Sequence, residues 1–130
     1  MSNKVLVVDD ELDIRVFMTT LLETNGFKTL SAADGRQGLE IARTGKPALV
    51  ILDVMMPSES GIQMYRELKG DPTMKDIPII MVSAVSRKTF FHSQQVLDEY
   101  KGEKVPEPAA YIEKPPDPDQ LLHVIRQILG

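Results

Sequence analysis

Short apolar runs alternate with segments of helical periodicity along this chain, and this alternation is the strongest constraint on its fold. A continuous apolar run, without the alternation of apolar and polar residues, is typical of a strand that is buried on both faces. The second run is half polar and is the weakest of the set. The predicted strands cover Lys4–Val8, Phe27–Ala32, Ala48–Leu52, Ile77–Val82 and Ala109–Ile112.

Between these runs, apolar residues recur at the three- and four-residue spacing of an amphipathic helix. Asn25 and Gly26 stand where the first helix should end, and the prolines from Pro115 to Pro118 break the chain before the last one. The predicted helices cover Ile14–Leu22, Gly35–Thr44, Ile62 to about Gly70, Ser86–Tyr100 and Leu121–Leu129. Strands that alternate with helices through short connections predict an α/β fold, a parallel sheet with helices on both faces.

Length and composition narrow the class of protein. A chain of 130 residues is one domain by size, so we expect a single domain over 1–130 with no effector domain. The absence of cysteine excludes disulfides, thiolate metal sites and a cysteine nucleophile. With a net charge of −4 and no cluster of Lys and Arg, direct binding to nucleic acid is not expected. No apolar run is long enough to span a membrane, and the first residues do not resemble a signal peptide.

Polar side chains follow four of the five predicted strands. Asp9 and Asp10 follow the first strand, Asp53 the third, Ser83 the fourth and Lys114 the fifth. The carboxyl ends of parallel strands share one edge of the sheet, so these residues should converge there. Three carboxylates at close range repel one another, and Mg²⁺ is a cation that suits a site with few oxygen ligands from the protein.

A lysine beside Mg²⁺ suits the binding of a phosphoryl group, and carboxylates form aspartyl phosphates. The set therefore predicts metal-assisted phosphoryl transfer onto Asp53, with Lys114 and Ser83 contacting the phosphoryl oxygens. Each residue also has an ordinary explanation when it is taken alone. Acidic residues favour the start of a helix, an aspartate suits a turn, and most lysines are solvated charges.

The motifs in their order resemble the receiver domain of two-component response regulators. They are Val5–Glu11, Leu52–Pro57 with Gly61, Val82–Ala84 and Tyr111–Pro115. The resemblance covers nearly the whole chain. It implies a chemotaxis-regulator-like, flavodoxin-like fold: a doubly wound sheet of five parallel strands in the order 2-1-3-4-5, with five helices in three layers.

The resemblance also implies roles for the acidic residues. Asp53 would be the phosphoacceptor. Asp10 would bind Mg²⁺ directly, Asp9 largely through water, and the backbone carbonyl of Met55 would supply a further oxygen. Gly61 is expected to serve the backbone rather than the chemistry.

The remaining motif residues would form a switch. Lys114 would pair with the phosphoryl group, Ser83 would move toward it, and Tyr111 would turn inward behind Ser83. Taken alone, Tyr111 could equally be an ordinary aromatic residue at the edge of the core. A cis peptide bond between Lys114 and Pro115 is implied as well.

The partners implied by the resemblance are proteins. A sensor histidine kinase or a histidine phosphotransfer protein would donate the phosphoryl group, and a downstream protein or an attached output domain would respond. The domain would not be an enzyme beyond assisting its own phosphorylation and dephosphorylation. A bacterial cytoplasm is the expected setting, and a homodimer through the fourth helix, fifth strand and fifth helix is one possible assembly. His92 and His123 are given no catalytic role.

Two features depart from the usual pattern of this family, the length of the stretch from 86 to 108 and Pro116 after Pro115, which stiffens the entry to the last helix. The stretch from 86 to 108 is longer than usual by about two helical turns, which is either a tolerated surface insertion or a partner-specific output face. Met55 and Val85, two residues past Asp53 and Ser83, are apolar and cannot orient a water molecule. We therefore expect a phosphorylated state that is not among the short-lived ones.

Three other classes of function remain open on the residues alone. A receiver-like interaction module that works without phosphate would share the fold, but the complete acidic set argues against it. A hydrolase with an aspartyl-phosphate intermediate often needs a second acid where Met55 stands. A flavin-binding domain would need a Gly-, Ser- or Thr-rich loop after the first strand, where Asp9-Asp10-Glu11 would repel a phosphate.

Overall fold

One parallel sheet forms the centre of the molecule. The computed structural model describes residues 3–54, 56, 60–92 and 106–130 of the chain. Its five strands pair in the order β2-β1-β3-β4-β5, and every pairing is parallel. The strands are β1 (Lys4–Val8), β2 (Lys28–Ala32), β3 (Leu49–Asp53), β4 (Ile79–Ser83) and β5 (Ala110–Glu113). The predicted fold class and the predicted strand order are confirmed.

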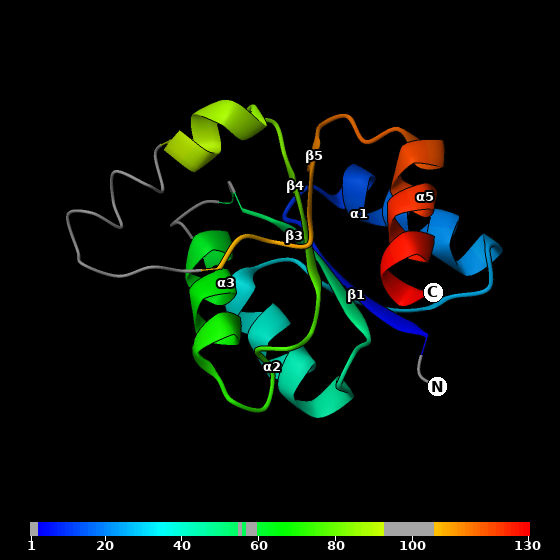
Figure 1. Ribbon diagram of the computed structural model, residues 1–130. Coiled ribbons are helices and arrows are strands. Elements are labelled where there is room, and N and C mark those ends of the chain that lie inside the picture. Colours follow the sequence, from blue (N-terminus) through cyan, green and yellow to red (C-terminus); the bar gives the residue numbers. More distant parts are fainter. Residues whose placement is uncertain (1–2, 55, 57–59, 93–105) are drawn as a thin grey trace.

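Helices cover both faces of this sheet, so the molecule has three layers (Figure 1). α1 (Leu12–Thr24) and α5 (Pro118–Leu129) lie on one face, and α2 (Gly35–Gly45) and α3 (Ser60–Gly70) lie on the other. A further helical segment begins at residue 87 and is described as far as residue 92. Within the described parts of the chain, no helix has the length and apolar character needed to cross a membrane.

Alternate residues of the strands supply two separate apolar cores. In β1, Leu6 and Val8 pack with α2 and α3, while Val5 and Val7 pack with α1 and α5. All four side chains are fully buried. This two-sided burial explains why the strand sequences are continuous apolar runs, since neither face can carry a polar residue without losing contact with a helix layer.

The predicted boundaries differ from the observed ones by a few residues. β4 begins at Ile79 rather than Ile77, because the backbone N–H of Ile77 donates to Met74 in the preceding turn. The last helix begins at Pro118, which the sequence placed in a chain break. Proline is tolerated in the first turn of a helix, where its missing N–H costs no hydrogen bond. Of the helix predicted over Ser86–Tyr100, residues 93–100 lie outside the described part.

Candidate functional site

Four polar residues that the sequence assigned to one edge of the sheet do lie there together. Asp9 directly follows β1, Asp53 and Ser83 end β3 and β4, and Lys114 directly follows β5. Asp9, Asp53 and Ser83 are buried, with 0%, 3% and 0% of their surface exposed. Burying a polar group costs free energy, so buried polar side chains have partners that compensate this cost.

Lys114 is the partner that joins the carboxylates. Its Nζ lies 3.0 Å from Asp9 Oδ2, 2.8 Å from Glu11 Oε1 and 3.1 Å from Asp53 Oδ2. Burial by itself lowers the pKa of Lys114, but the interactions of its ammonium with the three carboxylates outweigh that effect and raise the pKa above its ordinary value. Lys114 is therefore a fixed positive charge at the end of β5.

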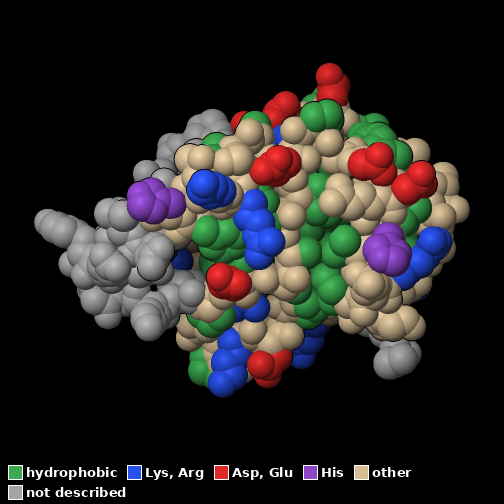
Figure 2. Space-filling view, turned by 45° about the horizontal axis from the view of Figure 1, so that its top comes forward, with side chains coloured by type: hydrophobic (Ala, Val, Ile, Leu, Met, Phe, Trp, Pro, Cys, Tyr) green, Lys and Arg blue, Asp and Glu red, His purple; other side chains and the backbone are tan. Residues whose placement is uncertain are grey.

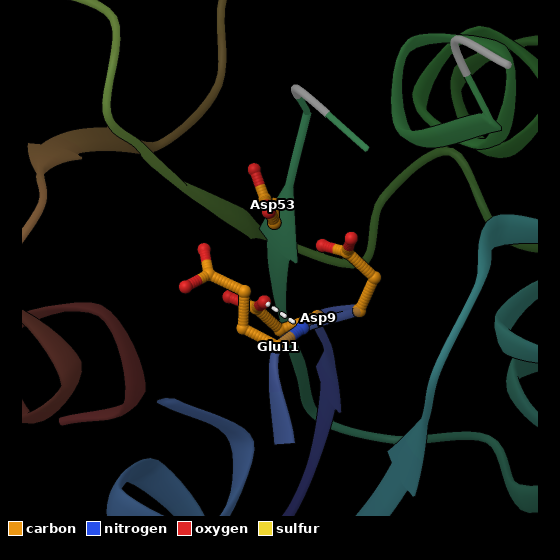
Figure 3. Close-up of side chains that lie close together, drawn as sticks. Asp9, Glu11 and Asp53 are labelled. Atoms are coloured by element: carbon orange, nitrogen blue, oxygen red, sulfur yellow. Dashed lines mark hydrogen bonds between the residues drawn. The ribbon is translucent and has the colours of Figure 1, made fainter. Parts of the chain in front are cut away.

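The three carboxylates that contact Lys114 form an acidic group together with a fourth, that of Asp10. Asp9, Asp10, Glu11 and Asp53 each offer one oxygen, and these oxygens lie within 4.8 Å of one another. Figure 3 shows Asp9, Glu11 and Asp53 clustered where β1 and β3 end. Carboxylate oxygens at this spacing are the donor set that a hard divalent cation prefers. This acidic group could therefore hold a metal ion.

Asp9 gives a structural reason why a cation fits this group. Its Oδ1 accepts a hydrogen bond from the Glu11 N–H at 2.9 Å, but its buried Oδ2 has no well-directed hydrogen bond in the described residues and faces Lys114. Burial raises the pKa of Asp9, against the opposing effects of Glu11 N–H and Lys114. A buried carboxylate oxygen of this kind gains from a further positive partner. Met55, whose carbonyl was expected to contribute, lies outside the described residues.

Gly61 lets α3 approach the end of β3. A Cβ atom on Gly61 would lie 2.2 Å from the backbone oxygen of Asp53 and 2.7 Å from Cα of Val54. Both are backbone atoms, which cannot swing aside as a flexible side chain could. The expectation that Gly61 serves the backbone agrees with this close approach.

The two residues expected to form the switch contact the same short segment after β4. Ser83 Oγ accepts a hydrogen bond from the Val85 N–H at 3.2 Å, and the Tyr111 hydroxyl donates to the Val85 carbonyl at 2.6 Å. The Tyr111 ring lies 5.5 Å from that of Phe90 and 5.6 Å from that of Phe91. Burial raises the pKa of Tyr111. Tyr111 thus connects β5 to the helical segment 87–92, and its role as a switch stays a prediction.

Comparison with known proteins gives the family. The family model of the response regulator receiver domain matches residues 5–126. The chain belongs to the response regulator receiver family. PilH of Pseudomonas aeruginosa is 32% identical over 98% of this chain and 98% of its own length. This receiver is therefore a domain of phosphorylation-switched signalling and not an enzyme of the usual kind.

A longer curated relative and a solved structure extend this comparison. The probable transcriptional regulator ycf27 of Porphyridium aerugineum is 38% identical over 98% of this chain, but the match covers 48% of the regulator. The chain thus spans about half the length of such relatives. The solved structure of the chemotaxis protein CheY4 of Vibrio cholerae has a TM-score of 0.79 at 26% identity, covering 98% of this chain and 99% of that one.

Sequence reasoning missed two contacts of this receiver. Glu11, named only as part of a motif, makes the shortest of the three contacts to Lys114. Arg15, one helical turn later, donates from Nη1 to the backbone oxygen of Asp9 at 2.6 Å. The signal for Glu11 was its place next to two other acids at a strand end.

The peptide bond between Lys114 and Pro115 is cis, as the resemblance implied.

The raised pKa of Asp9 predicts a pH-dependent effect on the stability of the receiver. We expect Asp9→Asn to raise the free energy of unfolding at pH 7, without divalent cations. The asparagine keeps an oxygen for the Glu11 N–H but carries no buried charge. Because the folded-state pKa lies above the ordinary value of 3.8, wild type is stabilised as the pH falls through that pKa, so the gain should shrink toward pH 4.

Urea unfolding at several pH values, with a chelator present, measures this difference. Asp13→Asn is a matched control, because Asp13 is an exposed acid in the first turn of α1. An Asp9→Asn variant that is less stable than wild type at pH 7 would show that the charge on Asp9 is favourable, contrary to this prediction.

Proposed function

We propose that this receiver accepts a phosphoryl group onto Asp53 with the help of Mg²⁺, from a sensor histidine kinase or a histidine phosphotransfer protein. The observation that carries the proposal is the position of the Asp53 carboxylate. It is buried at the end of β3, belongs to the acidic group, and lies 3.1 Å from the Lys114 ammonium. Such a carboxylate has both a place for a metal ion and a fixed cation beside it.

Asp10, Asp53 and the Met55 carbonyl would hold Mg²⁺, with Asp9 acting largely through water. When bound, Mg²⁺ offsets the negative charge of the phosphoryl oxygens and of the carboxylates around them. The protein's own part is to keep these oxygens together. Asp9 is held by the Glu11 N–H through its side chain and by Arg15 through its backbone oxygen.

In the transfer step, an oxygen of Asp53 forms the new bond to phosphorus. The bond from phosphorus to the donor histidine nitrogen breaks, and its electron pair stays on the imidazole. Lys114 then donates to the phosphoryl oxygens, and the Ser83 hydroxyl is the second donor from this edge. A move of Ser83 away from Val85 would alter the segment that also holds the Tyr111 hydroxyl. Phosphorylation would thus shift the balance between two conformations of this segment.

Residues 1–130 would act as one receiver unit in the cytoplasm, controlling a downstream protein or an attached output domain rather than nucleic acid or membrane directly. A homodimer through the helical segment 87–92, β5 and α5 remains one way to transmit the change in conformation.

A protein donor is supported by α1, which begins beside the acidic group and exposes apolar side chains. Leu12, Val16 and Phe17 are 61%, 51% and 38% exposed. Figure 2 shows hydrophobic side chains gathered between charged ones in the middle of one face of the molecule.

The test is the intact mass of the protein after incubation with acetyl phosphate and Mg²⁺. We expect one phosphate adduct in wild type and in the control Asp13→Asn, and none in Asp53→Asn or with a chelator. An adduct that persists in Asp53→Asn would contradict the assignment of the phosphoacceptor. If wild type forms no adduct and binds no beryllofluoride with Mg²⁺, a module that works without phosphate would replace the proposal.

A further inference from the structure

Glu11 occupies the N-cap position of α1 but does not cap the helix. Residues at this position usually accept a hydrogen bond from the first turn through their side chain. Glu11 makes no such bond, and its carboxylate instead reaches across to Lys114 at 2.8 Å. The side chain therefore serves the site at the sheet edge rather than the helix that it begins.

Carboxylates surround the Lys114 ammonium, which donates to Glu11 Oε1 and Asp53 Oδ2 and faces Asp9 Oδ2 at 3.0 Å. An ammonium has three N–H donors, and three carboxylate oxygens lie within 2.8–3.1 Å of Nζ. A phosphoryl group on Asp53 needs at least one of these donors. The phosphoryl group therefore competes with these carboxylates for the Lys114 ammonium.

Of the two carboxylates that stay ionised when Asp53 is phosphorylated, Glu11 can leave more easily than Asp9. The side chains of Asp9 and Asp53 are 0% and 4% exposed, whereas that of Glu11 is 58% exposed. A buried carboxylate that loses its cation pays the cost of an unpaired charge, while an exposed one exchanges it for water. The exchange of partners is thus cheapest at Glu11.

We propose that Glu11 is a positioning residue that holds the Lys114 ammonium in the unphosphorylated receiver and gives it up to the phosphoryl group. This inference rests on the proposed phosphorylation of Asp53. Glu11 then opposes phosphorylation in two ways. It competes for a donor of Lys114, and its negative charge lies beside the place that the anionic phosphoryl group must enter. The contact between Glu11 and Lys114 thus sets how readily the site accepts a phosphoryl group.

The experiment compares the affinity of beryllofluoride, a mimic of the phosphoryl group, at a Mg²⁺ concentration that saturates each variant. Removing an exposed ion pair supports a change of about two- to fivefold, so we expect Glu11→Gln to bind beryllofluoride tighter by that factor. Mg²⁺ affinity is measured separately for each variant by calorimetry. Asp13→Asn, which removes an equal charge from the first turn of α1, is expected to match wild type.

Two further variants separate competition for Lys114 from a general effect of charge. Glu11→Asp keeps the charge but shortens the side chain by one methylene, so it should lose the contact and bind beryllofluoride more tightly than wild type. In a Lys114→Met background, Glu11→Gln should give much less gain, since no ammonium remains to be released. A role limited to the stability of α1 would leave both comparisons unchanged.

The outcomes are distinct. Equal or weaker beryllofluoride binding by Glu11→Gln, with wild type binding normally, would overturn the role of Glu11 and leave the proposed function standing. An equal gain with and without Lys114 would also overturn it, because the effect would then be repulsion alone. A wild type that binds no beryllofluoride at saturating Mg²⁺ would instead contradict the proposed function.

Discussion

Replacing Lys114 with methionine is expected to lower the free energy of unfolding by about 3 kcal/mol in the presence of a chelator. The side chain of Lys114 is 9% exposed, and it contacts two carboxylates that are themselves buried. Methionine keeps most of the volume but removes the charge, so Asp9 and Asp53 would face each other without a cation. Urea unfolding followed by far-ultraviolet circular dichroism measures the change.

Added Mg²⁺ provides a second readout of the same substitution. A cation at the acidic group can replace part of the lost positive charge, so saturating Mg²⁺ should narrow the gap between Lys114→Met and wild type. Lys75→Met is the control, because Lys75 is exposed and should change stability little with or without the ion. If Lys114→Met is as stable as wild type in chelator, Lys114 does not compensate the buried carboxylates.

The fold could be predicted from the sequence because its signals are local. Each buried strand is an apolar run of its own, and the helices between them show their periodicity within a few turns. The exact start of β4 could not be predicted in this way. Ile77 is as apolar as the strand that follows it, and only its hydrogen bond to Met74 assigns it to the turn.

The site was predictable to the extent that sheet topology determines it. Asp9, Asp53, Ser83 and Lys114 each stand at a strand end, and parallel strands bring those ends together. The contact of Glu11 joins residues 103 positions apart. An acid at a helix start has an ordinary explanation, so the place of Glu11 beside two other acids did not by itself show that its side chain turns toward Lys114. Such pairings depend on the direction of a side chain, which residue patterns do not specify.

Gly61→Ala is the other substitution with a large expected effect. An added Cβ would overlap the backbone oxygen of Asp53 and Cα of Val54. The alanine can be accommodated only if α3 moves away from the end of β3. We expect the free energy of unfolding to fall by about 2–4 kcal/mol, the upper range for forcing an extra group into a packed site.

The other glycine of the same helix is the matched control. Gly70 is the last residue of α3, and a Cβ added to it would meet no atom within 4 Å. Gly70→Ala should leave stability unchanged or raise it slightly, because alanine restricts the unfolded chain and favours the helix. Urea unfolding of both variants tests whether the glycine requirement is local to Gly61. Equal stability of the two variants would contradict the close approach of α3 to β3.

The same pair of variants separates the stability of the fold from the geometry of the acceptor. Because the clash at Gly61 is with the backbone of Asp53 itself, relief of the clash should displace the carboxylate that Lys114 contacts at 3.1 Å. Phosphorylation by acetyl phosphate should therefore slow in Gly61→Ala even at temperatures where the protein is fully folded, and stay at the wild-type rate in Gly70→Ala. A folded Gly61→Ala protein that is phosphorylated at the wild-type rate would show that Asp53 keeps its position when α3 moves. The close packing of α3 would then support the fold without helping to position the phosphoacceptor.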